Sequence, residues 1–403
     1  MDSEADQVSQ TAEDPSRHAE LEIDNQKVSA ILEACRWNNV NALQSLAESE
    51  GGFLTDELRR KAWPVLLGVP NSQGEEERAD DTPDASWKEL PRHRDEEQVQ
   101  LDVNRAFIYY PVNQTDAQLD ERKRELSELI THVLRRYPYL CYFQGYHDIC
   151  QVFLLVLASP NQRARLVARL SALRIRDYML TTLEPTIHQL RLIPDILGAA
   201  DPSLRRHLAD TEPFYALAGT LTMYAHDIQT YGDIARLFDV LLSREPVFSI
   251  YLFAQIVLHR RDELFEQDPD DPSMLHLILS KMPQKMDLEK LIADTARLFR
   301  RFPPESLPAW RRISAASCLK TARSTEDCAK QTMEEGKAFF EKQLKELQAA
   351  ERRRKVLKTM WRYRKTAAAL GLAVAVGLIA VYIPRDSGPF TKVSAFFSKF
   401  LGR

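Results

Sequence analysis

The stretch LSELITHVLRRYPYLCYFQGYHDICQVFLLVL, residues 126–157, indicates the fold class of this chain most clearly. In its first half, apolar residues recur at i, i+3, i+4, i+7, i+8 and i+11, a spacing that places them on one face of a helix. These residues are Leu126, Leu129, Ile130, Val133, Leu134 and Tyr137. Residues 143–157 are apolar on most sides, as is typical of a buried helix. The stretch therefore predicts an amphipathic helix followed by a central buried one.

Helical spacing continues along most of the chain, so we expect an all-α fold. Period-2 alternation is essentially absent, and the 13 glycines are fewer than strand-rich folds or phosphate-binding loops usually need. The apolar stretch 237–258 contains two acidic residues, an arginine and a proline, which favours two core helices joined by a turn over a membrane span. The expected helices include residues 163–181, 185–199, 214–226, 230–242, 246–265, 273–281 and 287–300.

Composition shifts along the chain predict its domain organisation. The first 24 residues carry eight Asp or Glu against Arg17 alone, so residues 1–27 are expected to form an acidic disordered tail. A short helical segment, 28–54, leads into a domain over residues 55–305. Within this domain the acidic, polar stretch 71–97 is expected to be an exposed loop. Residues 306–365 are rich in Lys and Glu and are interpreted as an exposed helical stalk.

The C-terminal region contains a candidate membrane anchor, TAAALGLAVAVGLIAVYI, residues 366–383. These uncharged residues would span about 27 Å as a helix, close to the thickness of a thin bilayer such as that of the endoplasmic reticulum. Eight Lys or Arg between residues 351 and 365 predict that the preceding chain is cytosolic. Residues 384–403 are then a short lumenal amphipathic tail. A buried core helix is the alternative interpretation of the apolar run.

Other features of the sequence exclude several classes of function. The net charge of −4 gives no sign of a nucleic-acid partner. No nucleotide-binding, zinc-protease or serine-hydrolase signature is present, so the chain is expected to need no cofactor of its own. Histidines 147, 188 and 226 lack metal-ligand spacing and are interpreted as ordinary residues. Five scattered cysteines without C-x-x-C spacing suit a reducing compartment; they are Cys35, Cys141, Cys150, Cys318 and Cys328.

Two short motifs carry the candidate chemistry. The first is Val99-x-x-Asp102-x-x-Arg105, and the second is Tyr142-Phe143-Gln144-Gly145. Two longer blocks accompany them, Arg60–Gly68 (RKAWPVLLG) and Arg236–Leu242 (RLFDVLL). In this order the four blocks resemble the signature blocks of the TBC-domain Rab GTPase-activating proteins, over about residues 55–300. Val99 stands where the family usually has Ile, and Phe238 stands where it usually has Trp.

The resemblance implies an all-helical, two-lobed TBC domain in which Arg105 and Gln144 are catalytic. A permanently charged guanidinium supplied in trans offsets the charge of the phosphoryl-transfer transition state. A carboxamide can both accept from the attacking water and donate to an oxygen, so Gln144 is expected to replace the GTPase's own glutamine. The expected supporting residues are Asp102, which would orient Arg105 by a salt bridge, Tyr142, Gly145, which allows close backbone approach, and Asp148.

The implied partner is a GTP-bound Rab GTPase, which carries the GTP and Mg²⁺ itself. The chain would accelerate the Rab's own reaction and turn over no independent substrate. The predicted anchor adds the lipid bilayer as a partner. It resembles that of family members held in the endoplasmic reticulum membrane, which points to a Rab of ER-to-Golgi vesicle transport. Two alternatives remain: a non-catalytic Rab-binding module, and a tether that shapes the membrane.

Overall fold

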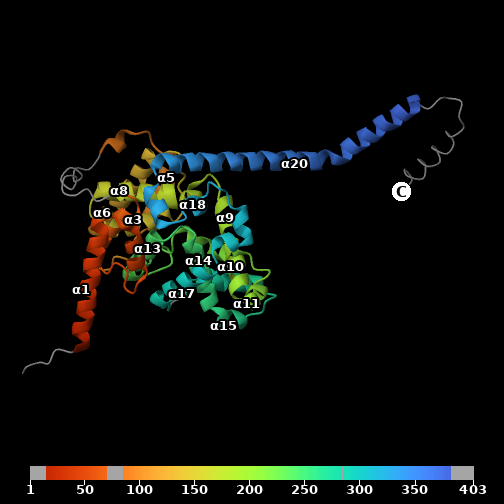
Figure 1. The fold of residues 1–403 in the computed structure, drawn as a ribbon. Coiled ribbons are helices and arrows are strands. Elements are labelled where there is room, and N and C mark those ends of the chain that lie inside the picture. The colour runs from red at the N-terminus through yellow and green to blue at the C-terminus, as the bar shows by residue number, and fades with distance from the viewer. Residues whose placement is uncertain (1–14, 70–84, 284, 383–403) are drawn as a thin grey trace, which may run out of the picture. The chain divides into compact units, whose positions relative to one another are not determined.

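The computed structural model describes residues 15–69, 85–283 and 285–382, and among them it contains helices and no strand (Figure 1). This confirms the predicted all-α fold class. In chain order the α-helices, the shorter η turns and the π-helical turn η2 are α1 (Pro15–Arg36), α2 (Val40–Glu48), α3 (Asp56–Leu66), η1 (Ala85–Glu89), α5 (Glu96–Val103), α6 (Asp116–Arg136), α7 (Tyr146–Val156), α8 (Pro160–Arg169), η2 (Leu170–Arg174), η3 (Arg176–Met179), α9 (Glu184–Leu190), α10 (Leu192–Ala200), α11 (Pro202–His207), η4 (Pro213–Ala216), α12 (Leu217–Leu221), α13 (Tyr231–Ser243), α14 (Phe248–His259), α15 (Arg261–Phe265), α16 (Pro272–Leu279), α17 (Leu288–Arg301), η5 (Pro304–Ser306), η6 (Pro308–Arg312), α18 (Cys318–Thr321), α19 (Thr325–Lys330) and α20 (Met333–Tyr382).

Helices α6 and α7 form from the stretch that predicted them. Thr115 caps α6 in a reciprocal capping box with Gln118, which satisfies two backbone N–H groups at the helix start. The buried face of α6 carries the apolar residues predicted for it, apart from Tyr137, which ends the helix. Helix α7 begins at Tyr146 rather than at residue 143 and is buried almost throughout. The three residues before it, 143–145, belong to a turn.

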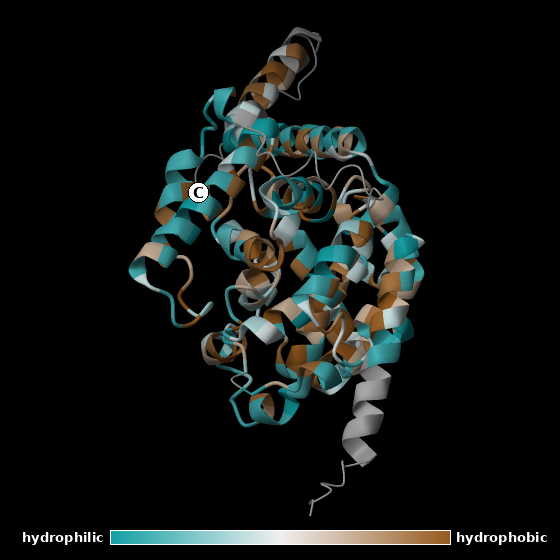
Figure 2. Cartoon of the chain, turned by 90° about the vertical axis from the view of Figure 1, so that its left-hand side faces the viewer, coloured by the Kyte–Doolittle hydropathy of each residue, from teal (hydrophilic) through white to brown (hydrophobic). Residues whose placement is uncertain are grey.

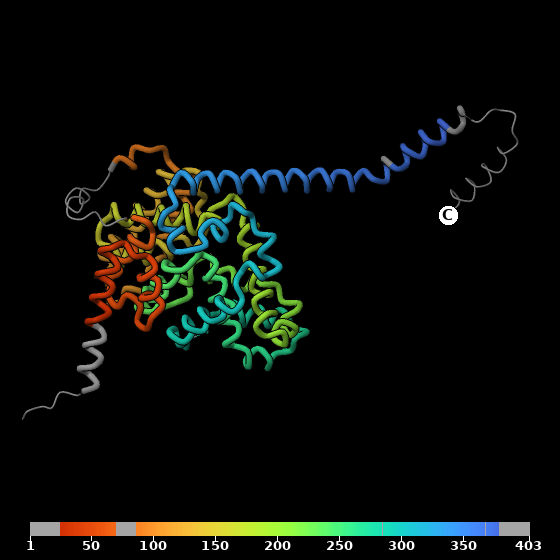
Figure 3. Tube along the Cα trace, in the orientation of Figure 1, coloured from red at the N-terminus to blue at the C-terminus, as the bar shows by residue number. Residues whose placement is uncertain are grey.

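The helices gather into two groups within the first compact unit of the chain. Helices α5 to α8 pack against one another, whereas α10, α14 and α17 form a second set of neighbours. Helix α13 contacts α2, α3 and α7 as well as α17, so it joins the two groups (Figure 3). The helices carry bands of hydrophobic residues beside hydrophilic ones (Figure 2), as expected for amphipathic helices around a shared core. Helices α13 and α14 confirm the prediction of two core helices between residues 237 and 258.

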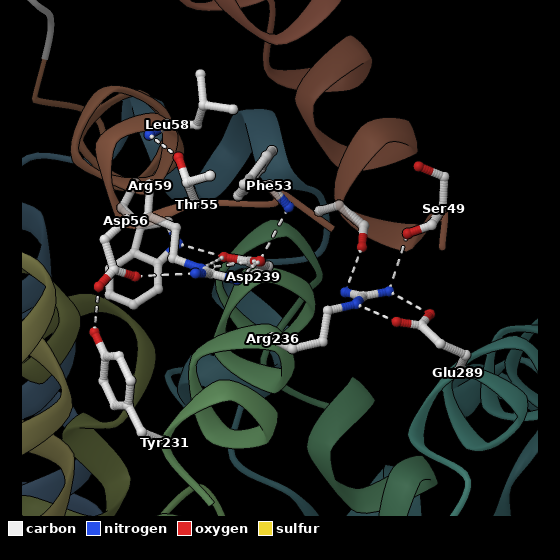
Figure 4. Close-up of polar contacts among 12 residues, drawn as sticks. Ser49, Phe53, Thr55, Asp56, Leu58, Arg59, Tyr231, Arg236, Asp239 and Glu289 are labelled. Atoms are coloured by element: carbon white, nitrogen blue, oxygen red, sulfur yellow. Dashed lines mark hydrogen bonds and ion pairs between the residues drawn. The ribbon is translucent and has the colours of Figure 1, made fainter. Parts of the chain in front are cut away.

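A buried polar network joins the chain before α3 to α13 (Figure 4). The Asp239 carboxylate is fully buried and accepts hydrogen bonds from the Phe53 backbone N–H (3.0 Å), the Arg59 guanidinium (3.0 Å to Nε) and the Trp63 indole (2.9 Å). Burial raises the pKa of this carboxyl, and Arg59 opposes that shift. The network therefore ties the first of the four sequence blocks to the last.

Arg59 and Phe238 show how these two blocks pack together. The buried arginine that pairs with Asp239 is Arg59, whereas the predicted block began at Arg60, whose Nε donates to the Val156 carbonyl. The Phe238 ring lies 6.1 Å from the rings of both Trp63 and Phe153, which lie 5.4 Å from each other. The replacement of Trp by Phe238 is therefore a change within the buried core.

The compact unit extends further than the predicted boundary at residue 305. It runs to Leu344, so much of the predicted stalk 306–365 belongs to the domain. The reason is a set of apolar side chains that the charged composition obscured. Those buried in this stretch include Leu307, Trp310, Ile313, Cys318, Leu319, Cys328 and Phe340.

The N-terminal part of the chain and the acidic stretch also differ from expectation. Helix α1 begins at Pro15, inside the predicted disordered tail 1–27, and residues 1–14 lie outside the described part. The predicted helical segment 28–54 is broken between α1, which ends at Arg36, and α2, which runs from Val40 to Glu48. In the predicted loop 71–97, residues up to 84 lie outside the described part, and the η1 turn that follows buries Trp87, which stacks on His132.

The predicted membrane segment 366–383 is not supported by the described residues. Among residues 15–69, 85–283 and 285–382, no helix is both long and apolar enough to cross a membrane. Its residues up to Tyr382 belong to α20, which also contains the basic run 352–365. Ile383 and the predicted lumenal tail 384–403 lie outside the described residues.

Candidate functional site

Arg105 follows the end of helix α5 in a tight turn. Its backbone N–H donates to the Asp102 carbonyl at 3.0 Å, and its side chain is exposed. Among the described residues, none forms a hydrogen bond or an ion pair with the guanidinium, although most other arginines of the domain are paired. The residue therefore presents an uncompensated, permanently charged group at the surface.

Gln144 lies in the turn that precedes α7. On one side, the Tyr142 backbone N–H donates to Asp95 at 2.9 Å, which fixes the start of the turn. On the other side, Gly145 is the N-cap of α7 with a φ of 98°, a left-handed conformation that strongly favours glycine. A Cβ at this position would lie 2.5 Å from Thr222 Cγ2. The exposed carboxamide of Gln144 is thus carried on a closely packed turn.

Arg105 and Gln144 line the same pocket, although they are 39 positions apart in the sequence. The pocket has a volume of about 220 Å³. Its walls come from the turn after α5, the start of α7 and the segment after α12. Besides the two predicted catalytic residues, its lining includes Asp102, Ile108, Tyr109, His147, Asp148, Gln151 and His226. A cation and a carboxamide therefore face one space large enough for a phosphoryl group and a water molecule.

Asp102 links the two motifs, but it does so differently from the prediction. Its buried carboxylate accepts from the Tyr142 hydroxyl at 2.8 Å and from the Gln98 carboxamide at 2.9 Å. It forms no ion pair with Arg105, because both carboxylate oxygens face Gln98 and Tyr142 while Arg105 lies beyond the end of α5 at Val103. The predicted salt bridge is therefore wrong. Asp102 and Tyr142 instead connect the segments that carry Arg105 and Gln144.

Two histidines flank Asp148 at the pocket, and sequence reasoning had set both aside. The His147 Nε2 lies 3.3 Å from one Asp148 oxygen, and the His226 Nδ1 lies 3.0 Å from the other. The hydrogen bond to Asp148 raises the pKa of His226 above its ordinary value of 6.5, and burial partly opposes this. His147 follows the end of the second motif by two residues, so its position was available from the sequence. No sequence signal marks His226.

Gln151 is a further site residue that the sequence did not reveal. It lies on α7, is buried, and uses both ends of its carboxamide on the backbone of the Arg105 segment. Its Oε1 accepts from the Phe107 N–H at 3.1 Å, and its Nε2 donates to the Tyr110 carbonyl at 3.2 Å. An isolated glutamine on a largely apolar helix carries no pattern that predicts this role.

A larger hollow of about 310 Å³ lies between η1, α6 and α8. Its charged groups are already paired: Arg124 lies 3.0 Å from Glu128, and Arg163 lies 3.6 Å from Glu125. It offers no uncompensated cation beside a carboxamide, so the smaller pocket is the better candidate site.

The fold agrees with the family comparison. The profile of the Rab-GTPase-TBC domain matches residues 56–265, just over half of the chain. This protein belongs to that TBC-domain family.

Particular relatives cover most of the chain. TBC1 domain family member 20 of Bos taurus is 37% identical over 304 residues, which are 74% of this chain and 73% of that protein. GTPase-activating protein gyp10 of Schizosaccharomyces pombe is 34% identical over 316 residues, 77% of this chain and 82% of its own length.

A solved structure supports the same fold. The crystal structure of the Ypt/Rab-GAP domain of Gyp1p superimposes with a TM-score of 0.55, covering 69% of this chain and 98% of that one. Its sequence identity is 16%, so this likeness concerns the fold alone.

Proposed function

We propose that this protein accelerates GTP hydrolysis by a Rab GTPase, with Arg105 and Gln144 supplied to the GTPase's active site. The observation that carries the proposal is their convergence on one pocket from two separate segments. The GTPase brings the GTP and the Mg²⁺, and this chain brings no cofactor. Its relatives include proteins named as GTPase-activating proteins.

The two side chains have complementary roles in this reaction. The Arg105 guanidinium donates to the phosphoryl oxygens on which negative charge is spread in the transition state. Gln144 orients the attacking water, accepting a hydrogen bond from it while donating one to a neighbouring oxygen. Neither side chain has a hydrogen-bond or ion-pair partner among residues 15–69, 85–283 and 285–382, so neither has to be released from one of these before the GTPase docks. Such an arginine is typically worth on the order of 10³–10⁵ in rate.

The proposal extends to a location at the endoplasmic reticulum membrane, with the TBC domain cytosolic and a Rab of ER-to-Golgi traffic as substrate. It is supported by the uncharged run of residues 366–383 and the basic run before it. Apolar side chains of this run that the structure describes are exposed, among them Leu370, Leu372 and Val374. Membrane attachment would raise the effective concentration of the domain near a lipidated Rab.

Phosphate release from a panel of GTP-loaded Rabs tests the activity. The chain lacking residues 366–403 is compared with its Arg105→Ala and Gln144→Ala variants. Arg300→Ala, an exposed arginine of α17 outside the pocket, is the matched control. We expect acceleration on at least one Rab, lost in both site variants and kept in the control. Binding without acceleration on any Rab would favour a non-catalytic binding module instead.

A further inference from the structure

The segment that follows Arg105 contains several large apolar side chains that are strongly exposed to solvent. Ile108 is 72% exposed, Val112 is 70% exposed and Tyr109 is 41% exposed. From Ala106 to Thr115 the sequence contains no charged residue. Exposed apolar groups gathered beside a functional pocket are typical of a surface that a partner covers.

This segment is held in place by contacts to other parts of the domain. The Gln151 carboxamide binds the backbone at both Phe107 and Tyr110. The Tyr110 hydroxyl donates to the Ala225 carbonyl at 3.2 Å, and its ring lies 6.0 Å from that of Tyr231. Phe107 and Tyr110 are therefore anchors, buried in the domain, and the residues between and after them face outward.

The position of this segment beside the pocket indicates which partner would cover it. Ile108 and Tyr109 line the same pocket as Arg105 and Gln144. Val112 lies seven residues after Arg105, with Tyr110 fixed between them. A GTPase whose GTP is reached by Arg105 must lie over this segment as well, because Ile108 and Tyr109 are both exposed and part of the pocket lining.

We propose that Ile108, Tyr109 and Val112 form a docking surface for the GTP-loaded GTPase and bind an uncharged, apolar patch beside its nucleotide site. This inference rests on the proposed function. It adds to it a surface that determines the affinity of this protein for the GTPase. Arg105 contributes in the transition state, whereas the three apolar residues contribute to binding before and during the reaction. Uniform binding of this kind lowers the half-saturating concentration without changing the maximal rate.

Single-turnover hydrolysis at increasing concentrations of this protein separates the two contributions. Ile108→Ser and Val112→Ser are compared with wild type, on the GTPase that responds best in the panel. We expect each substitution to raise the half-saturating concentration about tenfold, the loss expected when a large apolar side chain is no longer buried at an interface. The maximal rate should remain within about twofold of wild type. Leu277→Ser, an apolar residue of α16 that is 49% exposed and outside the pocket, should change neither quantity.

Direct binding of the same GTPase panel distinguishes failure of this inference from failure of the proposed function. Acceleration with unchanged half-saturation in both serine variants would overturn the docking surface while leaving the catalytic proposal intact. If wild type binds a GTPase without accelerating hydrolysis, weaker binding by the two variants would still support the docking surface. If wild type neither binds nor accelerates any GTPase, both proposals are overturned. Circular dichroism of the variants verifies that their fold is unchanged.

Discussion

At the scale of single residues, the placement of Gln144 depends on the glycine that follows it. Gly145 combines a left-handed φ of 98° with close contact to Thr222. We expect Gly145→Ala to lower the free energy of unfolding by about 1–3 kcal/mol from backbone strain alone. The new methyl group also has to displace Thr222, which would shift the turn and reduce GTPase activation. Thermal unfolding and phosphate release measure the two effects.

Thr222→Ser supplies the control for this prediction, because it removes the methyl group that the new Cβ would meet. Combined with Gly145→Ala, it should restore the stability and activity lost through steric contact with Thr222. The stability lost because alanine has to adopt a left-handed φ should not be restored. Wild-type stability and activity in Gly145→Ala would contradict the idea that this turn fixes Gln144.

His226 gives the pocket a pH-dependent contact. Its pKa is raised because it is hydrogen-bonded to Asp148, with the neighbouring Asp227 adding to the effect. Since the folded-state pKa lies above 6.5, the stabilisation from this pair is complete below about pH 6.5. It is then lost as the pH rises through the folded-state value. NMR titration of the imidazole should show the raised pKa in wild type and a lower one in Asp148→Asn. A His226 that titrates at or below 6.5 in wild type would contradict the contact.

At the scale of elements, the junction between α5 and α6 decides where Arg105 lies. Gln151, on α7, joins that junction by two hydrogen bonds. We expect Gln151→Leu, which keeps the side-chain size, to lower the maximal rate of activation by about 10- to 100-fold, since small misplacements of a catalytic group are costly. In the Arg105→Ala background the same substitution should have almost no further effect.

If Gln151→Leu lowered the maximal rate by the same factor with and without Arg105, this would contradict the idea that Gln151 acts by positioning Arg105. Hydrogen exchange supplies an independent readout. The Phe107 amide should exchange faster in Gln151→Leu, whereas amides of α17 should not change.

Sequence reasoning predicted elements better than their ends and connections. The spacing of Leu126 to Leu134 located α6, because burial of one helical face leaves a direct trace in the sequence. The turn that carries Gln144 was read as part of α7, since Phe143 and Tyr146 are as apolar as the helix itself. Only the left-handed backbone at Gly145 separates them, and glycine alone does not reveal its φ.

The same reasoning predicted the site in part. Arg105 and Gln144 were found through motif resemblance, and the structure brings them to one pocket. Gln151 and His226 were missed because their roles arise from contacts between distant segments, which no local pattern records. Asp102 was given the wrong partner for the same reason.

At the scale of the whole molecule, the Asp239 network holds the N-terminal helices to α13. Four hydrogen-bond donor groups surround a carboxylate that is fully buried. We expect Asp239→Asn to lower the free energy of unfolding by about 3–5 kcal/mol, because the buried charge of Arg59 then keeps only its ion pair with the partly exposed Asp56. Urea denaturation measures this loss.

Glu289→Gln is the matched control, because Glu289, on α17, pairs with an arginine of the same helix α13 that carries Asp239. Glu289 pairs with Arg236 at 2.7 Å but is 37% exposed, and Arg236 also donates to the carbonyls of Ala47 and Ser49. Glu289→Gln should therefore lower the free energy of unfolding by about 1 kcal/mol or less. Equal losses in the two variants would contradict the special role given to Asp239.

The extent of the domain was the hardest whole-molecule property to predict. Between residues 306 and 344 the charged side chains suggested an exposed stalk, yet Trp310 and Phe340 are buried. Their burial depends on partners far away in the sequence, such as Tyr139, whose ring lies 5.0 Å from that of Phe340. Average composition cannot reveal such contacts.

The measurement that tests the central proposal most directly uses a Rab whose own water-orienting glutamine is replaced by leucine. If Gln144 supplies that function, wild-type protein should still accelerate GTP hydrolysis on this Rab variant by at least about 10²-fold, a conservative part of the acceleration typical of such activators. Gln144→Ala should give almost none. Acceleration that disappears with the Rab's own glutamine, while Gln144→Ala remains active on the unmodified Rab, would contradict the assignment of Gln144.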